Sequence, residues 1–483
     1  MKYLHKFDSN ADFNQVRENN YIEPWVSATN NGNDEYRTDY NKSEYEKLLE
    51  TPLTFEILSD GNIVWKAQDY VYTSIEYKKN DGAWTSITSS TGGTNISVVS
   101  GDTVQFRGDN ATYWFDYTYN SFNGTTCGFN VKGNIMSLID STDFAMATTF
   151  ASSYTFCNLF SYCTGLTDAS NLVLPATTLV DGCYNSMFNG CTSLTTAPEL
   201  PATTLAGYCY SSMFQGCTSL TTAPALPATT LKSNCYDRMF YDCTGLTTAP
   251  ALPATTLVYG CYMNMFYDCT SLTTAPALPS MTLADDCYNY MFAYCTGLTT
   301  APALPATTLM YGCYDSMFEG CTSLTTAPSL SATTLAGNCY KSMFGGCTSL
   351  TTAPALPATT LAGYCYNSMF YGCTSLTTAP ELPATTLTGN CYNSMFQGCR
   401  SLTTAPELPA TTLASSCYQR MFSGCTSLNY IKCLATNISA YNCTSNWVSG
   451  VASSGTFVKN ASMSSWTRGV NGIPTNWTVE DAN

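Results

Sequence analysis

Paired cysteines are the side chains of this sequence with the widest chemical scope, because thiols can bind metals, form disulfides or attack substrates. The chain has 25 cysteines and a single histidine in 483 residues. In the stretch CYNSMFYGCTSL, Cys365 and Cys373 are separated by seven residues, and the same pair recurs every 26 residues from Cys183 to Cys425. The spacing decides which of the three chemistries is plausible.

Metal binding and catalysis find little support in this pattern. Zinc sites use CxxC-type pairs or histidines at ligand spacing, whereas here the only histidine is His5. We therefore expect no metal and no cofactor. One histidine also argues against Ser–His and Cys–His nucleophile pairs, and no GxGxxG or GxxxxGK[ST] pattern is present. A glycosidase pair stays open, but acidic side chains such as Asp242 and Asp268 recur at the repeat period, so we predict a non-enzymatic protein.

Two uses of the thiols remain open, namely disulfides within each repeat and reduced thiols packed as small hydrophobic side chains. The constant pairing favours disulfides. The first residues, MKYLHKFDSN, lack the apolar run of an export signal, which favours folding in a reducing cytoplasm unless a signal lies outside this sequence. The first unit keeps Cys163 but has Thr155 in place of the leading cysteine, so we favour reduced ladders. The cysteines assigned to the core include Cys183, Cys191, Cys209, Cys217, Cys365 and Cys373.

The elements that position these thiols are read from the repeat CYxxMFxGCTSLTTAPALPATTLxxx. Apolar residues fall at Cys365, Phe370, Cys373, Leu376, Leu382 and Leu387. This spacing predicts one short helical or 3₁₀ turn over CYNSMFYG and two extended pieces broken by prolines. The fold class is therefore mainly β with short helical turns, in a solenoid of 26-residue coils. At about 4.8 Å per coil, eleven coils would give a rod of roughly 50 Å.

These repeats resemble the BspA-like leucine-rich repeat family, whose units contain MFxGCTSL or AFxGCTSL followed by a proline-bearing strand. The resemblance covers about residues 150 to 430, with ten copies of the motif. It implies a leucine-rich-repeat solenoid in a surface or virion-associated protein that binds other surfaces. The chain departs from the family at the leading cysteine, where many members have Ile or Val, and this exchange supports a core role for the thiol.

The ten copies differ from one another at three places around the predicted turn. These are the three residues before each leading cysteine, the two after Cys-Tyr, and the one or two before the second cysteine. Tyrosine among small polar residues is typical of paratopes and can stack on sugars, so we predict ligand binding there, with drift on a solvated edge as the alternative. The tyrosines concerned are Tyr208, Tyr241, Tyr259, Tyr267, Tyr290, Tyr294, Tyr311, Tyr364 and Tyr371.

Four segments are expected: an N-terminal attachment segment at 1–50, an immunoglobulin-like β-sandwich at 51–145, the solenoid at 146–430 and a capping module at 431–483. In the sandwich, Asn80-Asp81-Gly82 and Gly101-Asp102 are predicted to join strands. The sandwich would serve as a spacer or bind carbohydrate. A hairpin turn is expected at 30–32, and Trp447, Trp466 and Trp477 would anchor the capping module over the last coil.

The two terminal segments resemble parts of structural proteins from gut Bacteroidales and their phages. We therefore predict a virion-associated phage protein, a tail fibre or a capsid or tail decoration protein, assembled in the host cytoplasm. Its expected partners are other virion proteins at the N-terminal segment and a host surface protein or glycan at the solenoid, with homo-oligomers left open. The net charge of −15 argues against nucleic acid, and no apolar run is long enough to enter a membrane. The alternatives are a bacterial cell-surface adhesin of the leucine-rich repeat type and a purely structural decoration protein.

Overall fold

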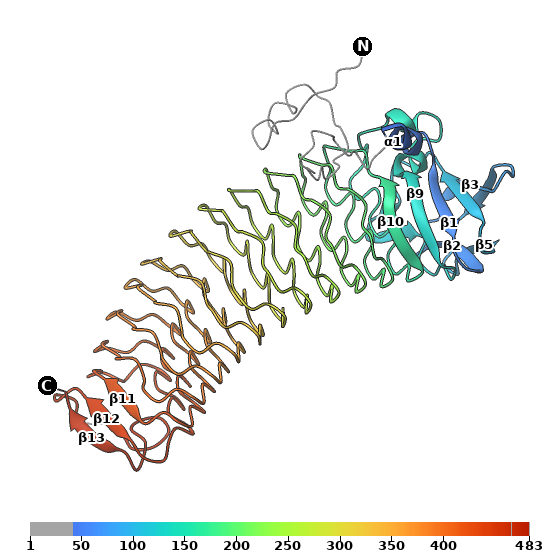
Figure 1. Ribbon diagram of the computed structural model, residues 1–483. Coiled ribbons are helices and arrows are strands. Elements are labelled where there is room, and N and C mark those ends of the chain that lie inside the picture. The colour runs from blue at the N-terminus through green and yellow to red at the C-terminus, as the bar shows by residue number, and fades with distance from the viewer. Residues whose placement is uncertain (1–41, 465, 483) are drawn as a thin grey trace, which may run out of the picture.

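The computed structural model describes residues 42–464 and 466–482 and consists of a sheet-rich module followed by a curved stack of coils (Figure 1). It is mainly β with almost no helix. The helices are α1 (Lys42–Leu49) and the 3₁₀ helices η2 (Ile135–Leu138) and η3 (Phe144–Met146). The strands are β1 (Leu53–Ile57), β2 (Gly61–Ala67), β3 (Ser74–Lys79), β4 (Thr85–Thr88), β5 (Thr94–Val98), β6 (Thr103–Arg107), β7 (Trp114–Phe115), β8 (Thr118–Ser121), β9 (Phe129–Asn134), β10 (Leu166–Val173), β11 (Tyr430–Cys433), β12 (Thr456–Lys459) and β13 (Thr478–Asp481). The hairpin turn expected at 30–32 lies outside the described residues.

Two sheets build the N-terminal module. One has the strand order β10-β9-β1-β6-β3-β4 and the other the order β5-β2-β8-β7. Alternating side chains of these strands are buried, as in β6, and the aromatic rings of Phe55, Phe106 and Phe122 meet between them. The hairpin predicted around Asn80 is confirmed, because β3 and β4 pair antiparallel on either side of it. The immunoglobulin-like assignment of the module stays a prediction.

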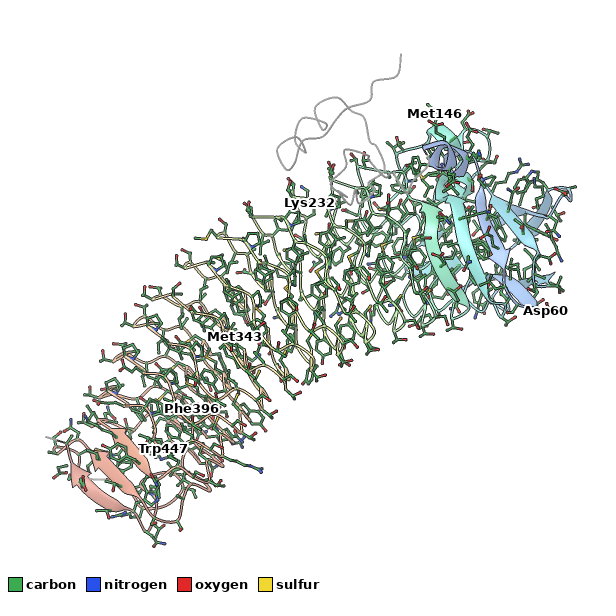
Figure 2. The ribbon with its side chains drawn as sticks, in the orientation of Figure 1. Asp60, Met146, Lys232, Met343, Phe396 and Trp447 are labelled. Atoms are coloured by element: carbon green, nitrogen blue, oxygen red, sulfur yellow. The ribbon has the colours of Figure 1, made fainter. Side chains whose placement is uncertain are left out.

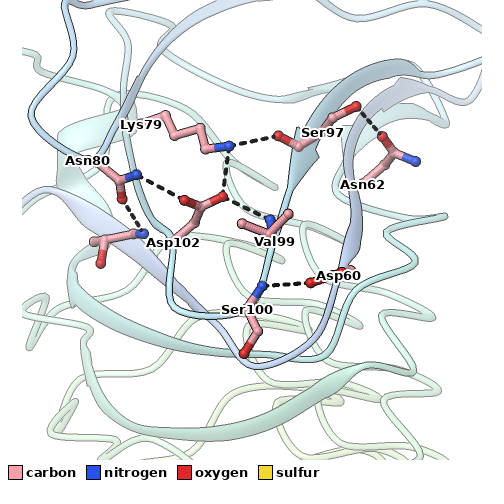
Figure 3. Close-up of polar contacts among 9 residues, drawn as sticks. Asp60, Asn62, Lys79, Asn80, Ser97, Val99, Ser100 and Asp102 are labelled. Atoms are coloured by element: carbon pink, nitrogen blue, oxygen red, sulfur yellow. Dashed lines mark hydrogen bonds and ion pairs between the residues drawn. The ribbon is translucent and has the colours of Figure 1, made fainter.

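Gly101 and Asp102 join strands β5 and β6, as predicted, and the segment crosses from one sheet to the other. β5 pairs with β2, whereas β6 pairs with β1 and β3. The Asp102 carboxylate fixes this crossing: it accepts the N–H of Val99 at 2.8 Å and the side-chain amide of Asn80 at 2.9 Å, and it pairs with Lys79 at 2.7 Å (Figure 3). The bond from Lys79, with those from Val99 and Asn80, lowers the pKa of Asp102 to about 2.

The module and the stack share one sheet and one core. Strand β10 belongs to the first, irregular unit, yet it pairs in parallel with β9 of the module. On its other side, Asp168 forms a parallel bridge with Thr196 of the next coil. A single buried cluster runs from Leu53 to Trp477. The module therefore closes the N-terminal end of the stack directly.

Each coil contains a ribbon of overlapping β-turns where a short helix was expected; we call it the turn ribbon. In one coil, the N–H groups of Cys365, Asn367 and Met369 donate to carbonyls three residues back. The intervening N–H groups of Tyr366 and Ser368 donate to the next coil. An α-helix would direct every N–H along its own axis, whereas this alternation leaves every second N–H free to join neighbouring coils. Parallel bridges between threonines, such as Thr204 with Thr230, join the extended pieces.

Stacked aromatic rings form two ladders inside the coils. Buried tyrosines from Tyr184 to Tyr418 and phenylalanines from Phe160 to Phe422 repeat at centroid distances of 5.4 to 6.1 Å. This spacing exceeds the roughly 4.8 Å of paired strands. The rings are therefore spaced more widely than paired strands, and the stack as a whole is curved (Figure 1).

The C-terminal residues continue the stack for further coils. Strands β11, β12 and β13 pair in parallel at this end. The buried Trp447 lies near the C-terminal end of the stack (Figure 2). Its indole ring stacks on Tyr418 at 6.2 Å and on Trp466 at 5.7 Å, and the indole N–H donates to the carbonyl of Gly472. The indole N–H of Trp477 donates to the carbonyl of Ala452 at 2.8 Å. The tryptophans thus cover the last rungs of the aromatic ladders with apolar surface.

Candidate ligand-binding face

Side chains of the turn ribbon point inward and outward in pairs. In the coil around Cys365, the pairs 365–366 and 369–370 are buried, while 363–364, 367–368 and 371–372 are exposed or half-buried. We call the surface made by these three outward pairs in all coils the variable face. It contains nearly all positions at which the ten copies differ in sequence, because only the first of the three residues before each leading cysteine lies outside these pairs. These variable places therefore lie at outward positions of the turn ribbon.

The backbone explains which residues the variable face accepts. The second residue of each outward pair has a positive φ, as in Tyr364 (59°), Ser368 (54°) and Gly372 (70°). This left-handed conformation favours Gly, then Asn and Asp, and disfavours bulky side chains. Most coils follow the preference, with Gly at 320, 346, 372, 398 and 424 in the third pair. Four of the predicted ligand-binding tyrosines occupy such positions despite it: Tyr208, Tyr290, Tyr294 and Tyr364.

All nine predicted tyrosines lie on the variable face, but they are not gathered into one site. Six are exposed: Tyr208, Tyr259, Tyr294, Tyr311, Tyr364 and Tyr371. The other three, Tyr241, Tyr267 and Tyr290, are half-buried. The structure brings four of them together, since the ring of Tyr267 lies 4.5 Å from Tyr241, 6.3 Å from Tyr290 and 5.2 Å from Tyr294. Their role in binding stays a prediction.

A shallow depression accompanies this aromatic cluster. Its volume is about 450 Å³, and its lining residues are Gln215, Arg238, Tyr241, Asn264, Tyr267 and Tyr290. The amide and guanidinium side chains were not among the predicted site residues. They occupy the same outward positions as the tyrosines, so position in the repeat, rather than residue type, was the signal that could have found them. Rings beside amides can stack on a ligand and hydrogen-bond to it.

Carboxylates surround the cluster, and burial raises the pKa values of several groups there. Burial raises the pKa of Asp237 to about 6, although Arg238 pairs with it at 2.9 Å and opposes the rise. Burial and then Asp242 raise the pKa of Asp268. Burial, followed by Tyr241, raises the pKa of Tyr267 to about 12. The region is therefore rich in hydrogen-bond acceptors and negative in charge.

The predicted core cysteines lie away from the variable face. All twenty-five cysteines are buried free thiols in the part of the chain that the structure describes. Burial raises the pKa of the Cys365 and Cys373 thiols to about 12, so they stay protonated and unreactive at neutral pH. Among the described residues, no group of three His, Cys, Asp or Glu side chains could hold a metal ion, and no helix has the length and apolarity needed to cross a bilayer.

Comparison with protein families gives one match. The model described as the BspA type leucine-rich repeat region (6 copies) matches residues 153–273, 236–351 and 339–447, which together are more than half of the chain. The matched region begins in the first, irregular unit and reaches Trp447 under the C-terminal coils. Comparison with curated proteins found no match. Comparison with solved structures found none either.

Proposed function

Because the chain belongs to the BspA-type leucine-rich repeat family, we propose that it is a non-enzymatic adhesion protein that binds a surface glycan through its variable face. The repeats themselves point to a surface or adhesion type of protein. The choice of a glycan as ligand rests on the tyrosines, amides and carboxylates of that face, because sugars offer both apolar ring faces and hydroxyl groups. Buried thiols that stay protonated at neutral pH, such as those of Cys365 and Cys373, support a role without catalysis.

The observation that carries this proposal is the placement of tyrosine at left-handed positions. Random drift at such positions would accumulate Gly, Asn and Asp, because these residues tolerate a positive φ. Tyr208, Tyr290, Tyr294 and Tyr364 instead have φ values of 53° to 61°. Each costs about 1 kcal/mol or more relative to Gly. Retaining a destabilising residue on the surface favours recognition over drift.

We propose further that the protein is part of a phage virion, as a tail fibre or a decoration protein assembled in the host cytoplasm. In this arrangement residues 1–50 would bind other virion proteins, and the coil stack would project toward a host surface protein or glycan. The resemblance of the terminal segments to phage structural proteins supports this role, and most of the N-terminal segment lies outside the described residues. The alternative is an exported bacterial adhesin, which would bind through the same face. The genes next to the coding sequence would distinguish a phage protein from a bacterial one.

For the N-terminal module we propose a spacer role in an immunoglobulin-like sandwich. The continuous sheet through β9 and β10 supports a rigid connection, because it leaves no linker between the module and the first coil. A rigid spacer would hold the variable face at a fixed orientation to the attachment point. Segment boundaries near residues 145 and 430 remain part of this proposal.

The test compares adsorption of the full chain to host cells and to a glycan array with that of a variant in which the nine tyrosines are serine. We expect the variant to lose most of its binding while its far-UV circular dichroism stays unchanged, since all nine side chains are outward. A matched control changes exposed threonines of the extended pieces, such as Thr378 and Thr386, to serine. Equal adsorption by all three proteins would leave only the structural role.

A further inference from the structure

We infer that Tyr294, flanked by Tyr267, Asp268 and Glu319, is a subsite for an uncharged pyranose ring. This inference rests on the adhesion function proposed above and assigns it a place and a ligand class. The subsite lies on the third outward pair of the variable face, and the neighbouring coils supply its other members.

The ring of Tyr294 lies flat across the backbone of the next coil. A Cβ atom built on Gly320 would meet the Tyr294 ring at 2.5 Å, so the ring covers the position where any other residue would place its side chain. Tyr294 has φ 61° and remains 39 % exposed. One face of the ring is therefore supported by Gly320, while the other is open to solvent.

The chain itself shows what such a supported ring can hold. Tyr154 occupies the equivalent left-handed conformation (φ 57°), and its ring lies over Gly182, where a Cβ atom would meet it at 2.2 Å. On this ring the module places Trp114, at a centroid distance of 4.5 Å and an angle of 24°. A flat group thus stacks on one tyrosine–glycine platform within the fold, and Tyr294 offers a similar platform without an internal occupant among the described residues.

Neighbouring side chains favour a hydroxylated, uncharged ligand. Tyr267 stands 5.2 Å from Tyr294 at an angle of 52°, which forms a side wall for the platform. Glu319 is close enough to be the main cause of a raised pKa at Tyr294, and Asp268 contributes to the same rise. Carboxylates accept hydrogen bonds from sugar hydroxyls but repel acidic sugars.

The cations nearby are already engaged and cannot compensate for an anionic ligand. Arg238 pairs with the buried Asp237 at 2.9 Å. Lys341 pairs with the buried Asp315 at 3.1 Å. Releasing either cation would leave a buried carboxylate unpaired, which is costly. The subsite therefore selects neutral hexoses or N-acetylhexosamines over uronic and sialic acids.

The test presents the full chain to an array of neutral and acidic oligosaccharides and measures affinity for the neutral ones that bind by calorimetry. Tyr294→Ser should weaken binding at least about tenfold through loss of the stacking face. Tyr117→Ser is the matched control, because Tyr117 is also exposed and has φ 71° but lies in the N-terminal module, off the variable face. Its affinity should change less than about twofold.

A second pair of variants separates the ring from the backbone. Gly320→Ala and Gly346→Ala each place a Cβ atom at φ 73°, so both carry the same conformational cost. Only the first would strike a tyrosine ring, since a Cβ atom at Gly346 meets nothing nearer than the backbone of Gly320 at 3.5 Å. We expect Gly320→Ala alone to reduce affinity.

The possible results separate this inference from the adhesion function. Binding to neutral glycans that Tyr294→Ser leaves intact, or binding to acidic glycans only, would overturn the subsite while the adhesion function stands. Equal losses in Tyr294→Ser and Tyr117→Ser would also overturn it, since the loss would then not depend on the variable face. Failure of the unchanged chain to bind any glycan or host cell would overturn both.

Discussion

The thiol of Cys373 donates a hydrogen bond to the main-chain carbonyl oxygen of Phe344 in the preceding coil, with the sulfur 3.0 Å from the oxygen. The same oxygen also accepts a hydrogen bond from the N–H of Cys347, so the thiol of Cys373 binds the second lone pair of the Phe344 oxygen. The contact repeats at the second cysteine of each pair, from Cys191 to Cys425. Leading cysteines such as Cys365 have their backbone partners within their own turn. The second cysteine column therefore joins coils, and the leading column fills space.

Valine substitutions should distinguish these two columns. We expect Cys373→Val to destabilise the protein by about 1 kcal/mol more than Cys365→Val, because only the former removes a bond between coils. Both substitutions add the same volume to a fully buried position, so their difference compares the bond between coils with the contacts that the Cys365 thiol makes within its own turn. Thermal and urea denaturation of the two variants and the unchanged chain measures it. Equal destabilisation would mean that the thiol–carbonyl contact contributes nothing beyond packing.

The number of reactive thiols tests the redox state that the buried ladders suggest. In denaturant without reductant, we expect all 25 cysteines to react with a thiol reagent. In the folded protein, burial holds the pKa of thiols such as Cys373 at about 12, against an ordinary value near 9.0, so they stay protonated and react slowly up to about pH 10. A count near zero in denaturant would show disulfides and contradict the free thiols of the structure.

Sequence alone predicted the repeat but not the path of the backbone within it. The period of 26, the inward Cys365, Phe370 and Cys373, and the family all follow from residue types that recur. The turn ribbon did not, because short apolar spacing fits a helix as well as overlapping turns. Its signature was available in the Gly, Asn, Asp and Ser that recur every fourth residue, at 182, 186 and 190 and their equivalents. Those residues were interpreted as variable surface rather than as left-handed backbone.

The candidate site, too, could be predicted from the sequence only in part. The nine tyrosines were identified because variation among copies marks outward positions, and outward positions follow from the repeat. Which of them cluster could not be predicted, since that depends on the distance between coils and on ring orientation. The platform at Tyr294 needed a third fact, namely that the next coil has Gly320 directly beneath the ring. The repeat period predicts that residues 26 positions apart lie next to each other in adjacent coils. It does not predict the rotamers of their side chains.

The buried carboxylate of Asp237 makes stability depend on pH. Its pKa rises from an ordinary 3.8 to about 6 through burial, so the folded state favours the neutral acid. The stability it contributes is fully present below pH 3.8 and is lost as the pH rises through 6. Asp237→Asn should therefore stabilise the protein at pH 7 by up to about 3 kcal/mol and change little at pH 3.5. Melting temperatures of both proteins at the two pH values measure this, and an unchanged or lower value at pH 7 would show that the Arg238 pair outweighs burial.

Replacing left-handed tyrosines by asparagine separates recognition from drift. Tyr208→Asn and Tyr364→Asn each relieve a positive φ at an exposed position, so we expect the double variant to be more stable by about 1 to 2 kcal/mol. If these rings bind a ligand, the same variant should adsorb less to cells or glycans, and stability and binding will move in opposite directions. Tyr371→Asn is the control, because Tyr371 is equally exposed but has no positive φ, and it should lose binding without gaining stability. A gain in stability with unchanged adsorption would show that these two tyrosines destabilise the protein without contributing to binding. Sequence drift would then explain their presence better than recognition.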